Sequence, residues 1–124
     1  MQDTYDELSQ FLSTLGMHEQ ITICGDFNSQ LGRNTPNVGK WSVHRRSNDA
    51  GDMLTEPLVR HNLCAASTMF QPPRRKKGAC STHVHKHEVH GKSPPRTQID
   101  YILQSKRHMN DVTSSRVRWG HAIT

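Results

Sequence analysis

The sequence predicts an α+β fold, in which helices and short strands share one hydrophobic core. Three segments carry this prediction. Residues 4–15 have the spacing of an amphipathic helix, residues 21–24 form a β-branched run, and residues 98–103 alternate between two sets of side chains. A helix followed by a strand favours helix packed on sheet. With 124 residues, the chain is long enough for one such core.

The first helix is predicted from apolar residues at steps of three and four over residues 4–15. Asp3 can cap its start and Gly16 can end it. Residues 21–24 then form an apolar and β-branched run that stops at Gly25. We expect a short, largely buried strand there.

The next stretch predicts a loop and a second helix. Residues 29–47 contain turn-forming Gly, Asn and Pro and show no sustained period, so we expect a loop that lies near the site. Asn48 is a good cap for a helix with leucines on one face. Pro57 would lie inside that helix, where proline costs about 3 kcal/mol, so we expect a kink or a restart capped by Thr55.

Three further strands are predicted over residues 63–70, 80–86 and 98–103. The basic segment 71–78 reads as an exposed loop between the first two. In the last strand, alternation puts Ile99, Tyr101 and Leu103 on one face and Asp100 and Ile102 on the other. No internal repeat or domain boundary interrupts residues 1–124.

The composition predicts a thin core and a polyanionic partner. Only 32% of residues are hydrophobic, against about 45–50% apolar residues, Gly included, in typical domains. Lys and Arg number 16 against 11 Asp and Glu, which favours nucleic acid as a partner. The basic residues that either contact phosphates or simply face solvent are Arg45, Arg46, Arg74, Arg75, Lys76 and Lys77.

The cysteine usage and the first residues predict an intracellular protein, nuclear or cytoplasmic and not secreted. The chain has 3 cysteines, which are scattered and form no disulfide or zinc-knuckle pattern. The first residues are acidic and polar, without an apolar targeting segment. No run reaches the roughly 18 apolar residues of a membrane span, so no membrane partner is expected.

Asp26 and Asn28 are the first candidate site residues, because they follow a predicted strand across Gly25. An aspartate can orient and deprotonate a water for attack on phosphorus, and a neutral asparagine can bind a phosphate oxygen without adding negative charge. The alternative is a turn in which both side chains bond only to nearby backbone.

Asp100 is the second candidate, because it lies between Ile99 and Tyr101 in a predicted strand. A carboxylate in such a place must lose its hydration or find a partner. Carboxylates of this kind orient a histidine or hold a metal ion. Alternatively, Asp100 faces solvent on an edge strand.

Gly25-Asp26-Phe27-Asn28 and Gln98-Ile99-Asp100-Tyr101, with residues 48–70 between them, resemble the endonuclease/exonuclease/phosphatase superfamily. The likeness is greatest to the endonuclease of LINE-type retrotransposons and to craniofacial-development-protein-like sequences. It implies a DNase I-like four-layer α/β/β/α sandwich that nicks DNA with Mg²⁺ or Mn²⁺. By position, Asp26 matches the acid that activates the water and contacts the metal. Asn28 matches the amide that contacts the scissile phosphate, and Asp100 matches the acid that orients the catalytic histidine.

The chain departs from the family in two places. The family also uses an Asn and a metal-binding Glu from strands before the first helix, and a Ser-Asp-His motif near its end. Neither is seen in residues 1–124. We therefore expect an incomplete domain that is weak or inactive alone, or else a fragment that only binds nucleic acid or protein. Exposed sheet edges would then favour association with another chain.

Two groups of histidines offer rival interpretations. His121 could replace the missing catalytic histidine, although no Asp precedes it. His83, His85 and His87 would lie on one face of a strand, and His90 follows them. These histidines either bind a metal such as Zn²⁺ or face solvent.

Overall fold

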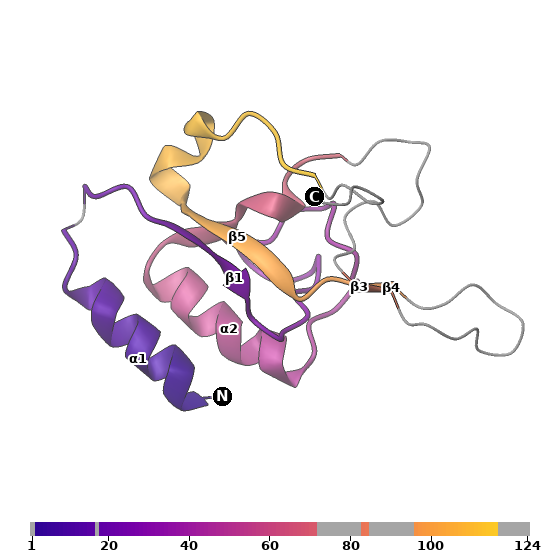
Figure 1. The fold of residues 1–124 in the computed structure, drawn as a ribbon, viewed down its shortest axis with the longest axis horizontal. Helices are drawn as coiled ribbons and strands as arrows, with labels where there is room; N and C mark the ends of the chain where they lie inside the picture. The colour runs from indigo at the N-terminus through magenta and orange to yellow at the C-terminus, as the bar shows by residue number, and fades with distance from the viewer. Residues whose placement is uncertain (1, 17, 72–82, 85–95, 117–124) are drawn as a thin grey trace, which may run out of the picture.

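The protein combines helices and short strands, so the predicted α+β class is confirmed (Figure 1). The structure, a computed structural model, describes residues 2–16, 18–71, 83–84 and 96–116. In chain order the elements are α1 (Gln2–Ser13), β1 (Thr22–Asp26), α2 (Asp49–Arg60), β2 (Leu63–Ala65), the 3₁₀ turn η1 (Ala66–Thr68), β3 (His83–Val84), β4 (Arg96–Thr97), β5 (Asp100–Ser105) and the 3₁₀ segment η2 (Lys106–Asp111).

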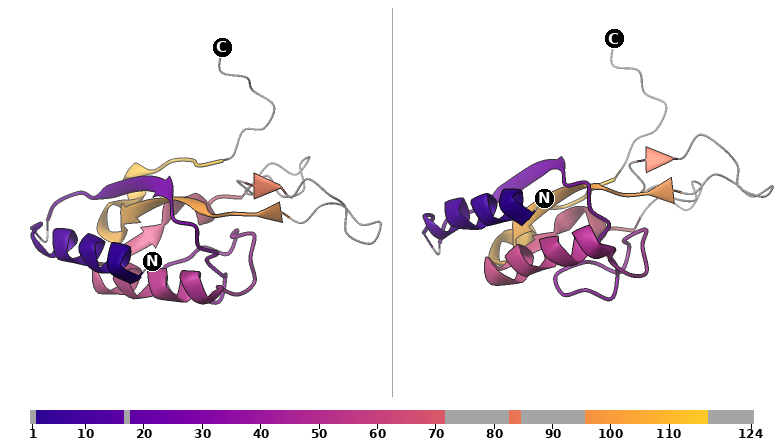
Figure 2. Two further views of the ribbon diagram at one scale, coloured as in Figure 1. Left: turned by 60° about the horizontal axis from the view of Figure 1, so that its bottom comes forward. Right: turned by 90° about the horizontal axis from the view of Figure 1, so that it is seen from below.

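β1, β5 and β2 form an antiparallel three-stranded sheet in that order, with β5 in the centre. β3 pairs with β4 in a separate two-stranded sheet. Figure 2 shows α1 and α2 on the same face of the larger sheet, where the two helices contact each other. The described elements therefore form a helix layer on a sheet layer. The DNase I-like four-layer sandwich stays a prediction.

The core lies between these two layers. β5 turns Tyr101 and Leu103 toward the helices, as the alternation predicts, and both side chains are buried. They pack with residues from both helices, the neighbouring strands and one loop, namely Tyr5, Leu12, Leu31, Leu54, Leu58, Leu63 and Ala65. The opposite face of β5, which carries Asp100, is therefore left for the site.

α2 begins where its cap predicts, because the Asn48 side chain accepts a hydrogen bond from the backbone N–H of Gly51 at 2.8 Å. The predicted restart at Thr55 is wrong. The helix runs through Pro57 as one element, and Thr55 Oγ1 donates to the carbonyl of Gly51 at 2.8 Å. Burial of Pro57 and of the leucines beside it offsets the missing backbone hydrogen bond.

β1 lies close to the predicted segment, but it runs through Gly25 to Asp26 and does not stop at Gly25. The expectation that it is largely buried is wrong. It lies at the edge of its sheet, and most of its residues are exposed, including Cys24. Alternation puts Thr22, Cys24 and Asp26 on the face turned away from α1 and α2. β1 has the apolar, β-branched sequence of a buried strand, but among the described residues no second layer covers this face, so it is exposed.

The other predicted strands are shorter in the structure. The strand expected over residues 63–70 ends at Ala65, where η1 begins, and Thr68 Oγ1 donates to the Ala65 carbonyl at 2.6 Å. Of the strand expected over residues 80–86, only His83–Val84 is described, as β3. Residues 29–47 contain no named helix or strand, as predicted.

Gly51→Ala is expected to destabilise the protein, although Gly to Ala inside a helix normally stabilises by about 1 kcal/mol. A Cβ atom at Gly51 would overlap the carbonyl oxygen of Gln30, which belongs to the backbone and has little freedom to move. We expect a loss of about 2 kcal/mol in the free energy of unfolding by urea. Gly25→Ala is the control, because a Cβ there meets nothing within 4 Å. A stabilised Gly51→Ala variant would contradict this packing.

Candidate active site

The pairing of β1 with β5 brings the two predicted acids together. Asp26 and Asp100 are directly opposite one another in the register of the two strands. Side chains of directly opposed residues point to the same face, with Cβ atoms roughly 4.5–5.5 Å apart. This pair lies on the face turned away from α1 and α2, at the end of β1 and the start of β5 (Figure 1). Asp26 is exposed and Asp100 is half-buried.

Two acidic side chains opposed in this way are an unfavourable pairing for a sheet. Like charges directly across a ladder destabilise a sheet. The stability of the sheet alone would favour an uncharged residue at one of these two positions. The pair therefore has the features of a functional site, in which stability is given up for binding or catalysis.

The chain turns sharply after Asp26, and this turn positions Asn28. Asn28 has a positive φ of 49°, a conformation that asparagine tolerates better than most residues. Its backbone N–H donates to Asp26 Oδ1 at 2.8 Å. The local turn bond considered as an alternative from sequence is thus present for Asp26. It uses one carboxylate oxygen and fixes the direction of the carboxylate.

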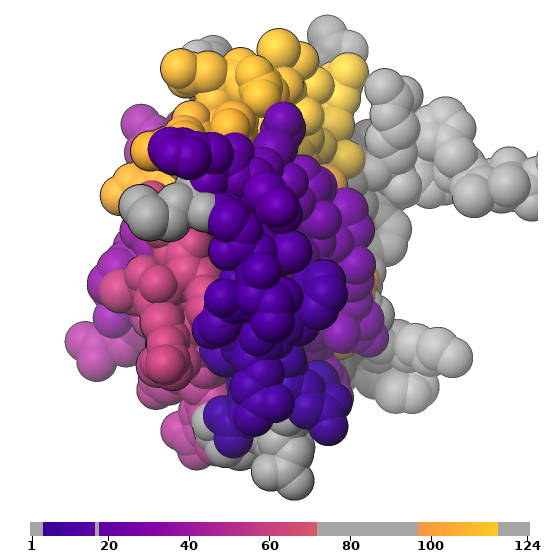
Figure 3. Space-filling model, turned by 90° about the vertical axis from the view of Figure 1, so that its left-hand side faces the viewer, coloured from indigo at the N-terminus to yellow at the C-terminus, as the bar shows by residue number. Residues whose placement is uncertain are grey.

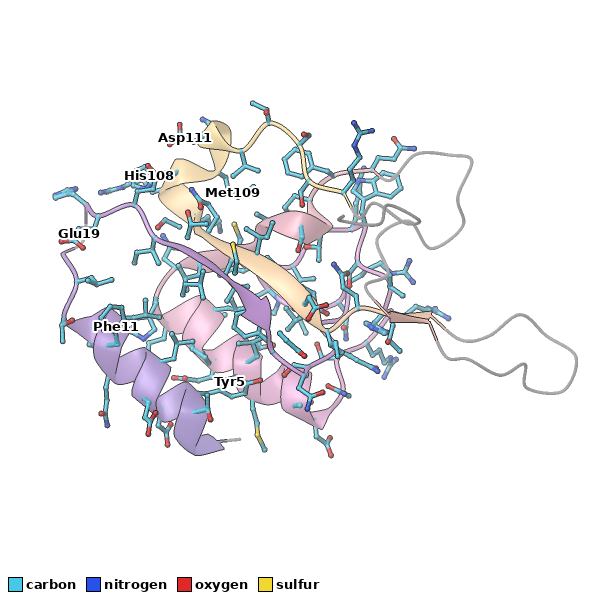
Figure 4. All side chains as sticks on the ribbon, viewed as in Figure 1. Tyr5, Phe11, Glu19, His108, Met109 and Asp111 are labelled. Atoms are coloured by element: carbon cyan, nitrogen blue, oxygen red, sulfur yellow. The ribbon has the colours of Figure 1, made fainter. Side chains whose placement is uncertain are left out.

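A side chain of α1 forms hydrogen bonds to the same turn. The Tyr5 hydroxyl donates to the carbonyl of Phe27 at 3.0 Å and also contacts the hydroxyl of buried Ser29. Figure 4 labels Tyr5 between α1 and α2, among the side chains of the core. The backbone beside Asp26 and Asn28 is thereby tied to the helix layer. Preorganised side chains of this kind favour catalysis and tight binding.

Asp100 lies on the central strand of its sheet, so the edge-strand alternative is wrong. Asp100 is half-buried, and the strand paired with it at this position is β1. Just before β5, buried Gln98 donates its backbone N–H to His44 Nε2 at 3.1 Å. Gln98 Oε1 is buried without a hydrogen-bond partner among the described residues. Sequence patterns did not single out His44, because it belongs to no recognisable spacing. Gln98 belongs to the Gln98-Ile99-Asp100-Tyr101 motif, but the motif alone assigned it no role.

His44 is expected to make the stability of the protein depend on pH. Burial lowers the pKa of His44 below the usual 6.5. The unfolded chain therefore binds more protons at this ring than the folded chain, so the stabilisation from the neutral ring is complete above about pH 6.5. It is lost as the pH falls through that value toward the lower pKa of the folded state. Protonation would also remove the acceptor for Gln98.

The check is the melting temperature of wild type and of His44→Gln between about pH 7.5 and pH 5. Glutamine keeps an acceptor but does not titrate, so the variant should lose less on acidification. Burial also lowers the pKa of His61, which gives a dependence of the same sign in both proteins. Identical pH profiles would rule out a contribution of His44.

A groove lies between α1 and the edge strand β1, and of the two opposed acids only Asp26 lines it. It has a volume of about 350 Å³ and is mostly apolar, with Tyr5, Leu8, Ile23 and Phe27 in its wall. Asp26 and Asn28 also line it. An apolar groove next to a polar end suits a ligand with a planar or apolar part attached to a charged group.

Comparison with known proteins finds one relevant relative. Craniofacial development protein 2 of Tragulus javanicus is 27% identical over 118 residues, which are 94% of this chain and 19% of that protein. The chain thus spans about a fifth of the length of that relative. No family model matches the chain. No solved structure matches it either. This distant relative supports the predicted resemblance to craniofacial-development-protein-like sequences. It does not by itself support the wider superfamily.

The described residues suit a loosely held metal ion and not an enclosed one. They contain no group of three His, Cys, Asp or Glu that could hold a metal. Mg²⁺, however, binds through one or two carboxylates, several waters and the phosphates of a substrate. Asp26 and Asp100, opposed in the register of β1 and β5, could supply the carboxylates of such a donor set.

The remaining candidate residues divide into exposed and undescribed ones. Arg45 and Arg46 are exposed and follow His44, whose ring contacts Gln98 just before β5. The basic and histidine candidates that lie outside the described residues are Arg74, Arg75, Lys76, Lys77, His85, His87, His90 and His121. His83 begins β3, and its side chain is not described. Within the described residues, no helix is long and apolar enough to cross a membrane.

Proposed function

We propose that the chain hydrolyses phosphodiester bonds of nucleic acid, most readily by nicking DNA, in a slow reaction that depends on Mg²⁺ or Mn²⁺. The observation that carries the proposal is the register of β1 and β5, which puts Asp26 opposite Asp100 on an open face. The two acids belong to motifs far apart in the sequence, and a fold that only needed stability would separate them. We place this activity inside the cell, in the nucleus or the cytoplasm.

Each polar residue has a role that its position allows. Asp26 is exposed at the end of β1, where its carboxylate can orient a water and take its proton. Asn28 presents a neutral amide next to it, which can donate a hydrogen bond to a phosphate oxygen. Asp100, opposite Asp26, is a positioning residue. A bound Mg²⁺ would offset the charge of the pair and polarise the phosphate.

The surroundings favour a nucleic acid over a small phosphoester. The chain has a net charge of +5, which attracts a polyanion. Arg45 and Arg46 are exposed on the loop that His44 ties to the start of β5, and they can contact flanking phosphates. The apolar groove beside Asp26 can take a base or a sugar.

The test of this function measures cleavage of three substrates in the presence of Mg²⁺. They are supercoiled plasmid DNA, a labelled single-stranded RNA and p-nitrophenyl phosphate. We expect nicked plasmid, little RNA cleavage and no release of nitrophenol. Removal of the metal with EDTA should abolish nicking, and addition of Mn²⁺ should restore it. Nicking that persists in EDTA would contradict the proposal. Faster cleavage of RNA or of the ester would change the substrate class.

A binding module without a reaction is the second candidate. It is favoured by the lack of a three-ligand metal group among the described residues. The exposed edge strand β1 could then also associate with another chain. Binding of duplex DNA that weakens steeply with salt, together with no nicking at any metal concentration, would support this candidate over the enzyme.

A further inference from the structure

A second cavity lies at the end of the sheet opposite the acidic pair. It has a volume of about 380 Å³ and is lined by the ends of α1 and α2, the segment before β1, and η2. Figure 3 looks onto this end of the molecule, where these four segments lie next to one another. Asp26 and Asn28 do not line this cavity. It is therefore separate from the proposed active site.

Basic side chains dominate the polar part of the lining. Arg60 and His61 come from the end of α2, and Arg107 and His108 come from η2. Glu19 is the one carboxylate among the residues that line the cavity. Figure 4 labels Glu19 and His108 at the same end of the molecule. With both histidines neutral, the two arginines still outweigh the single carboxylate.

Each of the two arginines has an exposed contact with a neighbouring side chain. Arg60 Nη1 lies 3.6 Å from Glu56 Oε1, but both side chains are 63% exposed, and ion pairs of this kind contribute little. Arg107 Nη1 lies 2.6 Å from His18 Nδ1 in an exposed contact. An exposed arginine can exchange such a contact for a stronger, charge-assisted bond to an oxyanion.

Two histidine nitrogens at this cavity are unsatisfied. His61 Nε2 and His108 Nδ1 are buried atoms without a hydrogen-bond partner among the described residues. Buried polar atoms are nearly always paired in folded proteins, so two such atoms around one cavity call for an explanation. A neutral imidazole carries one N–H, so a ligand with several acceptor oxygens could pair with both rings in the tautomers that place the proton on these nitrogens.

We propose that this cavity binds an oxyanion of the phosphate class, held by Arg60, His61, Arg107 and His108. A metal cation is the competing ligand, because the carbonyl ends of α1 and α2 favour positive charge. However, no group of three metal-ligating side chains exists among the described residues. The basic side chains already offset the helix ends.

Inorganic phosphate is the probe for this site. Phosphate is titrated into the ¹⁵N-labelled full chain at one fixed pH, with chloride at matched ionic strength as the reference. We expect saturable shifts of the His61 and His108 ring signals. Shifts that stay linear in phosphate, or that chloride reproduces, would overturn the proposal.

Arg107→Gln should weaken phosphate binding about tenfold, the effect of losing one charge-assisted hydrogen bond. Arg33→Gln is the matched control, because Arg33 is also exposed but does not line the cavity. Equal weakening by both variants would show only general charge attraction and would overturn the site. His61→Gln provides a second variant if Arg107→Gln loses its fold.

Asp26→Asn separates this proposal from the proposed activity. Asp26 does not line the cavity, so the variant should bind phosphate as tightly as wild type while it loses nicking. Loss of both properties in Asp26→Asn would place phosphate at the acidic pair instead and would overturn the second site.

Discussion

Asp26→Asn is expected to lower the Mg²⁺-dependent nicking rate by about a thousandfold, the size of effect seen when a general base is removed. Asparagine has nearly the same shape as aspartate, and its Oδ1 can still accept the Asn28 N–H that Asp26 accepts at 2.8 Å. The turn should therefore be preserved while the negative charge and the basic oxygen are lost. The measurement is the conversion of supercoiled to relaxed plasmid over time.

Asp52→Asn is the matched control for this experiment, because Asp52 is an exposed aspartate in the first turn of α2. It should nick at the wild-type rate. If Asp26→Asn also nicks at that rate, Asp26 has no part in the mechanism. If wild type gives no metal-dependent nicking, the enzyme proposal fails and the binding module remains.

Tyr101→Phe is expected to lower the free energy of unfolding by about 2–3 kcal/mol, because two buried backbone groups lose their partner. The Tyr101 hydroxyl accepts the backbone N–H of Leu31 at 2.9 Å and donates to the carbonyl of Gln98 at 2.8 Å. The side chain is only 2% exposed, so water cannot replace either bond without a rearrangement. Urea denaturation gives the difference directly.

Thr14→Val is the control for the loss of a hydroxyl. Thr14 Oγ1 donates to the carbonyl of Phe11 at 2.6 Å, but this bond is exposed, so water can take over. We expect a loss of about 0.5 kcal/mol or less. A Tyr101→Phe variant within that same range would contradict the bridge that ties Leu31 and Gln98 together beside the site.

The elements that could be predicted from sequence are those with a clear period. α1 follows from its apolar stripe, and β5 follows from the alternation around Asp100. The exposure of β1 could not be predicted, because burial depends on which strands and layers lie next to it. The continuation of α2 through Pro57 could not be predicted either. Packing of Leu54 and Leu58 in the core outweighs the low helix propensity of proline.

The candidate site shows the same division. Asp26, Asn28 and Asp100 were found from motifs and from a charge between apolar neighbours. That Asp26 lies opposite Asp100 depends on the register of two strands about 70 residues apart, which neither strand encodes alone. His44 was missed because its role depends on a backbone N–H 54 residues away.

A double-mutant cycle on the nicking rate tests most directly whether Asp26 and Asp100 act as one site. The rates of wild type, Asp26→Asn, Asp100→Asn and the double variant are measured on the same plasmid with Mg²⁺. If the opposed acids work together, each single change should remove most of the activity and the double change should cost little more. An Asp100→Asn variant that nicks at the wild-type rate, or single losses that simply multiply in the double variant, would contradict a shared site.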